Sequence, residues 1–171
     1  MIIWGGEIYT QTIYGTGGRY NPSTDTWTPT SMTNAPSPRA LHTAVWTGGE
    51  MVIWGGHNDT GYLNTGGRYN PVTDSWTTTR IANAPEPRDS HTAVWTGNEM
   101  IVWGGGAYLN TGAKYNPETD SWTAISTINA PSERYHHTAI WTGKVMEDAY
   151  RGRFEDFLKA KKRLRACDQI W

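Results

Sequence analysis

Two kinds of side chain with binding and acid–base chemistry recur in register three times along the chain. In each copy an arginine is followed three residues later by a histidine. The pairs are Arg39 with His42, Arg88 with His91, and Arg134 with His137. A guanidinium binds a carboxylate through two parallel hydrogen bonds, and a neutral imidazole is a common metal ligand. Which chemistry these residues perform depends on the elements that position them.

Those elements belong to a repeat that fills most of the 171 residues. The motif Trp-Gly-Gly begins at Trp4, Trp54 and Trp103, and the motif Tyr-Asn-Pro begins at Tyr20, Tyr69 and Tyr115. From each of these tyrosines to a later tryptophan is always 26 positions, whereas the connection from Trp-Gly-Gly to the tyrosine varies between 12 and 16. A constant frame with one variable connection is typical of a packed unit with one exposed loop.

Each unit is predicted to contain four short strands. Residues 91–95 have strand-forming types, and Gly97-Asn98 then predicts a tight hairpin turn. The apolar run 100–103 is consistent with a strand buried on both faces. A third strand contains the tyrosine, an Asn-Pro turn follows it, and the fourth strand contains a tryptophan such as Trp76.

The order of Gly-Gly, then Tyr, then Trp seven positions later, at a period of about 50, resembles the kelch repeat. The resemblance covers residues 1–143 and implies an all-β fold, a segment of a β-propeller with three four-stranded blades. It also implies that the repeated aromatic and imidazole side chains hold neighbouring blades together. These are Trp27, Trp76, Trp122, Trp46, Trp95, Trp141, His42, His91 and His137.

The repeat starts and stops out of phase. Residues 1–4 match the second strand of a blade, and residues 137–143 match an innermost strand. We therefore expect 137–143 to complete the first blade, either within the chain or in a partner chain. Because propellers typically have 4–8 blades, three blades predict a homodimer of six blades or a fragment of a longer or engineered protein.

The segment 144–171 differs in composition, with eight Lys/Arg and both Phe residues. Its apolar residues from Met146 to Leu164 follow helical spacing, which predicts an amphipathic helix. The helix would pack on the propeller, bind a partner or membrane surface, or be an appended segment. Acidic neighbours and a net charge of −1 argue against nucleic acid as the partner.

In kelch relatives, residues at the position of Arg39, Arg88 and Arg134 line one mouth of the channel, and some of them bind acidic peptides. The resemblance therefore implies a ligand-binding role for these three arginines; the alternative is a salt bridge between blades, with Glu86, Asp89 or Glu133 as neighbours. The three histidines are expected on different blades, too far apart to share one metal, so no metal site is predicted. Their alternative role is to bond backbone groups between blades.

The variable loops are the expected source of specificity. They contain Tyr14, Tyr62 and Tyr108, which are suited to stacking on sugars or peptides. The predicted function is a non-catalytic binding module for a peptide or glycan on the loop face. A structural or assembly unit is the alternative, and a mutarotase-like sugar isomerase is disfavoured because no singular constellation of catalytic residues is visible.

The sequence indicates no cofactor and gives only weak information on the cellular compartment. Galactose oxidase, another kelch-like fold, uses copper with a tyrosine linked to cysteine, but Cys167 lies in the tail, so no cofactor is predicted. No apolar run is long enough to span a membrane and no signal peptide is visible. The default location is the cytoplasm, with an exported parent protein as the alternative.

Overall fold

The structure, a computed structural model, describes residues 1–8, 12–106, 108–143 and 146–149. All regular elements of these residues are β-strands. The strands are β1 (Ile2–Trp4), β2 (Gly17–Asn21), β3 (Thr26–Pro29), β4 (Thr43–Trp46), β5 (Met51–Trp54), β6 (His57–Asn58), β7 (Gly61–Tyr62), β8 (Gly66–Asn70), β9 (Ser75–Thr78), β10 (Thr92–Trp95), β11 (Met100–Trp103), β12 (Gly112–Asn116), β13 (Ser121–Ala124), β14 (Thr138–Trp141) and β15 (Met146–Ala149). The predicted all-β class is confirmed.

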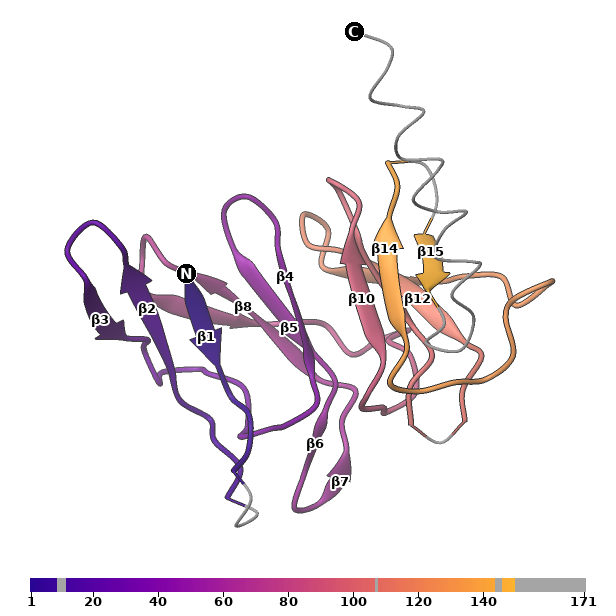
Figure 1. The fold of residues 1–171 in the computed structure, drawn as a ribbon, viewed down its shortest axis with the longest axis horizontal. Helices are drawn as coiled ribbons and strands as arrows, with labels where there is room; N and C mark the ends of the chain where they lie inside the picture. Colours follow the sequence, from indigo (N-terminus) through magenta and orange to yellow (C-terminus); the bar gives the residue numbers. More distant parts are fainter. Residues whose placement is uncertain (9–11, 107, 144–145, 150–171) are drawn as a thin grey trace, which may run out of the picture.

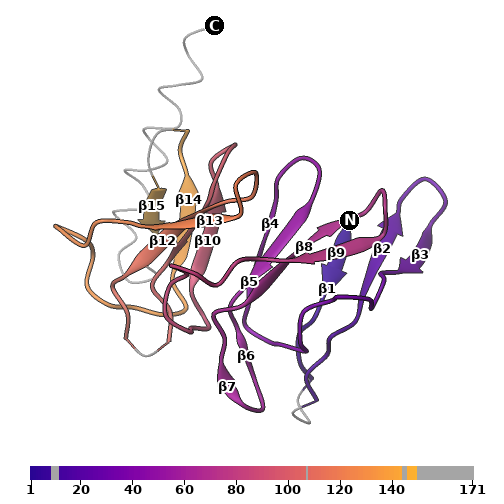
Figure 2. The ribbon, with the colours of Figure 1, turned by 180° about the vertical axis from the view of Figure 1, so that it is seen from behind.

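The strands form four antiparallel sheets that follow one another along the chain. Sheet 1 is β1-β2-β3, sheet 2 is β4-β5-β8-β9, sheet 3 is β10-β11-β12-β13 and sheet 4 is β14-β15. The hairpin β6-β7 projects from the loop between β5 and β8. The sheets lie side by side, and β10 contacts both β4 and β14 (Figures 1 and 2). Sheets 1 and 4 are at opposite ends of this row.

The innermost hairpin of each later sheet has the same register. Trp46 pairs with Met51, Trp95 with Met100 and Trp141 with Met146. Sheet 1 begins at β1, which corresponds to the second strand of sheets 2 and 3, because Trp4 pairs with Gly17 as Trp54 pairs with Gly66. Among the described residues, sheet 1 therefore lacks the strand that β4 and β10 supply to their sheets.

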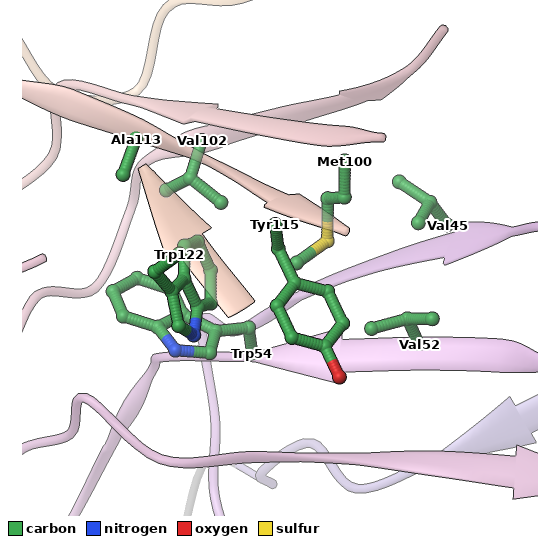
Figure 3. Close-up of a cluster of buried hydrophobic side chains, with 8 residues drawn as sticks. All are labelled: Val45, Val52, Trp54, Met100, Val102, Ala113, Tyr115 and Trp122. Atoms are coloured by element: carbon green, nitrogen blue, oxygen red, sulfur yellow. The ribbon is translucent and has the colours of Figure 1, made fainter. Parts of the chain in front are cut away.

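Tryptophan rings pack where sheets meet. Between sheets 2 and 3, the rings of Trp54 and Trp122 lie 5.1 Å apart among Val52, Met100 and Tyr115 (Figure 3). Between sheets 1 and 2, the rings of Trp4 and Trp76 lie 5.3 Å apart. A tryptophan buries about 150–250 Å². At about 25 cal/mol per Å², each one stabilises the interface by roughly 4–6 kcal/mol before entropy is counted.

The predicted interface tryptophans are not equally buried. Trp76 and Trp122 are 3% and 4% exposed, and their indole nitrogens donate to the backbone oxygens of Ser31 and Arg80 in the loop that leaves the preceding sheet. The equivalent Trp27 is 50% exposed, because no sheet precedes sheet 1 among the described residues. Trp46 is also exposed, and Trp95 and Trp141 are half-buried.

The structure differs from the expectation for the end of the repeat. Residues 146–149 form strand β15, not the start of the predicted helix. The physical reason is the preceding turn: Gly143 has φ 87°, in the left-handed region, as do Gly48 and Gly97 in the matching hairpins. Because β14 pairs with β15, residues 137–143 do not complete sheet 1 within the chain. The predicted helix over 150–171 lies outside the described residues.

Candidate functional site

Two of the three repeated arginines are fully buried. Arg39 is 1% exposed and Arg88 is 0% exposed. The Nη1 of Arg39 donates to the carbonyls of Gly55 at 3.0 Å and Thr65 at 2.7 Å. These two residues flank the variable loop of sheet 2, so the guanidinium holds both ends of that loop together.

Arg88 makes the same contacts in sheet 3. Its Nη1 donates to the carbonyls of Gly104 at 3.0 Å and Thr111 at 2.7 Å, and its Nε donates to the carbonyl of Glu86 at 3.0 Å. Burial lowers the pKa of Arg39 and of Arg88 to about 10, so both remain cationic near neutral pH.

This geometry gives no support to ligand binding by Arg39 and Arg88, which stays a prediction. Their donors are directed at backbone carbonyls inside their own sheets, and the salt bridge between sheets expected as the alternative is also not what these donors form. Arg134 also donates to a backbone carbonyl, that of Ser132 at 3.0 Å, but it is only half-buried, and its guanidinium carbon lies 6.0 Å from the centroid of the Trp103 ring. Arg134 is therefore the member of the three that a ligand can reach.

The repeated histidines lie between sheets. The Nε2 of His91 is 2.8 Å from the hydroxyl of Thr43 in the preceding sheet, and the Nε2 of His137 is 2.9 Å from the hydroxyl of Thr92. Each ring also meets a tryptophan of the preceding sheet edge-on, with centroids 5.3 Å apart for Trp54–His91. His91 and His137 thus contact hydroxyl side chains, whereas His42 has the expected backbone hydrogen bond, to Trp4 of the preceding sheet.

Burial keeps the imidazoles of His91 and His42 neutral. It lowers the pKa of His91 to about 3, with the charge of Arg88 as the second cause. It lowers the pKa of His42 to about 4, with Arg39 as the second cause. Within the described part of the chain, no group of His, Cys, Asp or Glu side chains has the arrangement of a metal site.

The residue directly before each histidine was missed by the sequence reasoning. Leu41, Ser90 and His136 have φ of 52°, 51° and 52°. The amide of Ser90 donates to the carbonyl of Leu41, and the amide of His136 donates to the carbonyl of Ser90, both at 3.1 Å. The three residues thus form a chain of backbone hydrogen bonds across sheets 2, 3 and 4. They line a hollow of about 430 Å³. A signal was present, because the two positions between the repeated arginine and histidine change type from one repeat to the next.

Loops from three sheets also bring together an imidazole and two carboxylates. The Nδ1 of His57 is 3.1 Å from the Oδ2 of Asp89, and its Nε2 is 3.8 Å from the Oε2 of Glu7. Asp89 is 8% exposed, and the backbone of His57 pairs with that of Ala40. We call Glu7, His57 and Asp89 the loop triad. Glu7 and His57 occupy the same position of successive repeats, directly after Trp-Gly-Gly, and the third repeat has Gly106 there. Equal spacing along the chain did not show that their loops meet.

The comparison with known protein families decides what these repeats are. Residues 1–147 match the family model described as the KLHDC2/KLHL20/DRC7 Kelch-repeats domain. The chain belongs to this kelch-repeat family. A search of curated proteins gives no match. Kelch repeat domains generally mediate protein–protein interactions.

The variable loops of the kelch repeats present the predicted tyrosines separately. Tyr62, on β7, is 50% exposed, and Tyr108 is 73% exposed. The ring of Tyr108 packs edge-on against Tyr135, with centroids 6.0 Å apart. Tyr14 is 39% exposed, and its backbone bonds Gly6 and Arg39. The three therefore offer aromatic surface on three different loops.

The part of the chain that the structure describes contains no helix with the length and apolar character needed to cross a bilayer.

Proposed function

We propose that this kelch module is a non-catalytic interaction domain that binds a peptide segment of a protein partner on its loop face. The observation that carries this proposal is the hollow of about 430 Å³ beside Leu41, Ser90 and His136. Three repeats with nearly the same frame present an apolar, a hydroxyl and an imidazole side chain there. A set of different groups at equivalent positions is suited to reading a side-chain sequence.

The accessible chemistry of this face is aromatic and acidic. Tyr62 and Tyr108 are exposed, and Glu7 of the loop triad is exposed as well. Arg39 and Arg88 are buried, whereas Arg134 is partly exposed and donates to the carbonyl and hydroxyl of Ser132. These groups favour a peptide with apolar and basic residues over a purely acidic one.

The test is selection of a displayed linear peptide library against the full chain, with a glycan array in parallel. Leu41→Asp and Tyr62→Ala are expected to weaken the selected peptide at least about tenfold, since each such contact contributes on the order of 1–2 kcal/mol. The matched control is Val72→Ala, at a 91% exposed turn residue. Glycan binding without peptide binding contradicts the peptide class, and equal loss in the control contradicts the site.

A second candidate function is assembly, with two copies forming a ring of six blades. It is favoured by an apolar groove of about 450 Å³ between β1 and sheet 2. Native mass spectrometry of the full chain tests it, because a dimer is expected and a persistent monomer contradicts it.

A further inference from the structure

The apolar groove of about 450 Å³ lies beside the unpaired edge of β1. It is lined by Met1 and Ile2 on one side and by Ala44, Val45, Trp46 and Met51 on the other. In sheets 2 and 3 the second strand is paired on both edges, β5 by β4 and β8, and β11 by β10 and β12. Among the described residues, β1 is paired on one edge by β2 alone. An unpaired edge offers backbone donors and acceptors to a further strand.

The register of the complete sheets specifies which sequence fits this edge. In sheet 2 the innermost strand pairs Thr43 with Trp54, Ala44 with Ile53, Val45 with Val52 and Trp46 with Met51. Sheet 3 repeats the pattern from Thr92 with Trp103 to Trp95 with Met100. Transferred to β1, the pattern requires Thr opposite Trp4, Ala opposite Ile3, a branched aliphatic residue opposite Ile2, and Trp opposite Met1. Strand β14 has this sequence, Thr138-Ala139-Ile140-Trp141.

The strand that now pairs with β14 departs from the repeat. In sheets 2 and 3, the alanine of the innermost strand and the residue that follows it are each paired with an aliphatic residue of the second strand. In β15 those register positions hold Asp148 and Glu147, and Ala149 stands where the other sheets have Trp54 and Trp103. Strand β1 has Ile2, Ile3 and Trp4 at the same positions and therefore agrees with the repeat better than β15 does.

Strand β14 of the same chain does not meet β1, because the two lie in the sheets at opposite ends of the row in both views (Figures 1 and 2). We propose that two copies exchange strands: β1 of each copy takes the place of β15 beside β14 of the other. The occupant of the groove is thus β14 of a second copy, and the product is a closed ring of six four-stranded sheets. This inference rests on the assembly proposed above and specifies its contacts.

The repeated contacts between sheets then predict those between copies. Thr43 bonds His91 and Thr92 bonds His137, so Thr138 of one copy is expected to bond His42 of the other. Trp76 donates to Ser31 and Trp122 to Arg80, so Trp27 is expected to donate to the backbone oxygen of Ser126 in the other copy. The exchange thereby buries Trp27, which is 50% exposed in the single chain.

The exchange is tested by cross-linking in the full chain. Cys167→Ser removes the native thiol, and Ile3→Cys with Ala139→Cys places two thiols at directly paired positions of the proposed interface. Directly paired residues in an antiparallel sheet have Cα atoms about 4.5–5.5 Å apart, within disulfide reach. Oxidation is expected to yield a covalent dimer in most of the protein. The matched control, Ile3→Cys with Ile140→Cys, is shifted by one residue and places the thiols on opposite faces.

The outcomes separate the exchange from the other proposals. No covalent dimer, equal yield in the shifted control, or a ladder of longer covalent oligomers overturns the exchange into a closed ring. A dimer by native mass without the in-register cross-link overturns the exchange and leaves assembly standing. Circular dichroism of both double-cysteine variants shows whether they fold like the parent, and a second in-register pair, Ile2→Cys with Ile140→Cys, repeats the test with the same expected result. Peptide binding on the loop face is measured separately and does not depend on the result.

Discussion

The same residue types occur at the contact between sheets 2 and 3 and at the free end of sheet 1, but they are buried at the contact and exposed at the free end. Trp122 is 4% exposed and Trp27 is 50% exposed, although both follow a Tyr-Asn-Pro turn at the same spacing. In each repeat the tyrosine hydroxyl donates to the turn aspartate, as Tyr115 does to Asp120 and Tyr20 to Asp25. The difference shows that local geometry comes from the repeat itself, whereas burial comes from the neighbouring sheet.

The largest expected effect comes from truncating the two tryptophans. Trp122→Ala removes a ring that packs on Trp54 and is expected to lower the free energy of unfolding by about 3–5 kcal/mol. Trp27→Ala is expected to cost less than about 1 kcal/mol in the isolated chain, since half of that side chain is already in water. Urea denaturation at low protein concentration measures both. Equal losses would contradict the contrast between the two regions.

Arginine substitutions extend the comparison to the loops. Arg88→Ala removes the side-chain donor to the carbonyl of Gly104 and one of the two donors to the carbonyl of Thr111, and it is expected to cost about 3 kcal/mol. Arg134→Ala, at a half-buried position, is expected to cost less than about 1 kcal/mol. Thermal denaturation measures the difference. If Arg88→Ala instead left stability unchanged and abolished peptide binding, the interpretation that Arg88 holds the two ends of its loop together would be wrong.

Acid is expected to weaken the contact between sheets 2 and 3 through His91. Its pKa is lowered to about 3 in the folded chain, from about 6.5 in the unfolded chain. The unfolded state therefore binds the extra proton first, so the stabilisation is complete above pH 6.5 and is lost as the pH falls toward 3. Urea midpoints at a series of pH values measure this loss. His91→Asn is expected to be less stable at pH 7 and to show a shallower decline between pH 6.5 and 3, and an unchanged slope would refute the assignment.

His42 offers a weaker version of the same effect at the free end. Its pKa is lowered to about 4, so the corresponding loss extends from about pH 6.5 only to about pH 4. The substitution His42→Asn should therefore change the pH dependence of urea unfolding less than His91→Asn does. A larger change would show that sheet 1 is already covered in solution.

The smallest expected effects are in the loop triad. Glu7→Gln removes a partly exposed contact of 3.8 Å and should change stability by less than about 0.5 kcal/mol. Asp89→Asn alters a buried carboxylate 3.1 Å from the His57 ring and should cost about 1 kcal/mol. Thermal denaturation compares the two variants. A larger loss of stability for Glu7→Gln would contradict the expectation that the more buried carboxylate contributes more.

The fold was predictable because the repeat encodes strand length, turn type and register together. Constant spacing from Tyr69 to Trp95 and from Tyr115 to Trp141 requires the same path in each unit, and the structure has that path. The strand at 146–149 was not predicted, because the tail has helical spacing and the positive φ of Gly143, which forms the hairpin turn, is visible only in the structure. A turn that appears twice upstream is the more reliable indicator.

The site was less predictable for a physical reason. Arg39 and Arg88 bond backbone carbonyls, and a carbonyl has no signature in the sequence. An arginine repeated at this spacing therefore looks the same in the sequence whether it binds a ligand or holds the two ends of a loop together. Glu7 and His57 of the loop triad occupy the same position in two repeats, and only the folded chain shows that their side chains lie 3.8 Å apart.

The left-handed residue before each histidine has a consequence for how this surface can change. Leu41, Ser90 and His136 hold the same backbone conformation and are linked to one another by main-chain hydrogen bonds, which do not depend on the type of side chain. An amino acid that tolerates positive φ can be exchanged there with little disturbance of the scaffold. Single substitutions at these three positions can therefore change which partner is bound without altering the fold. The three positions are the natural ones to vary in a library of engineered binders.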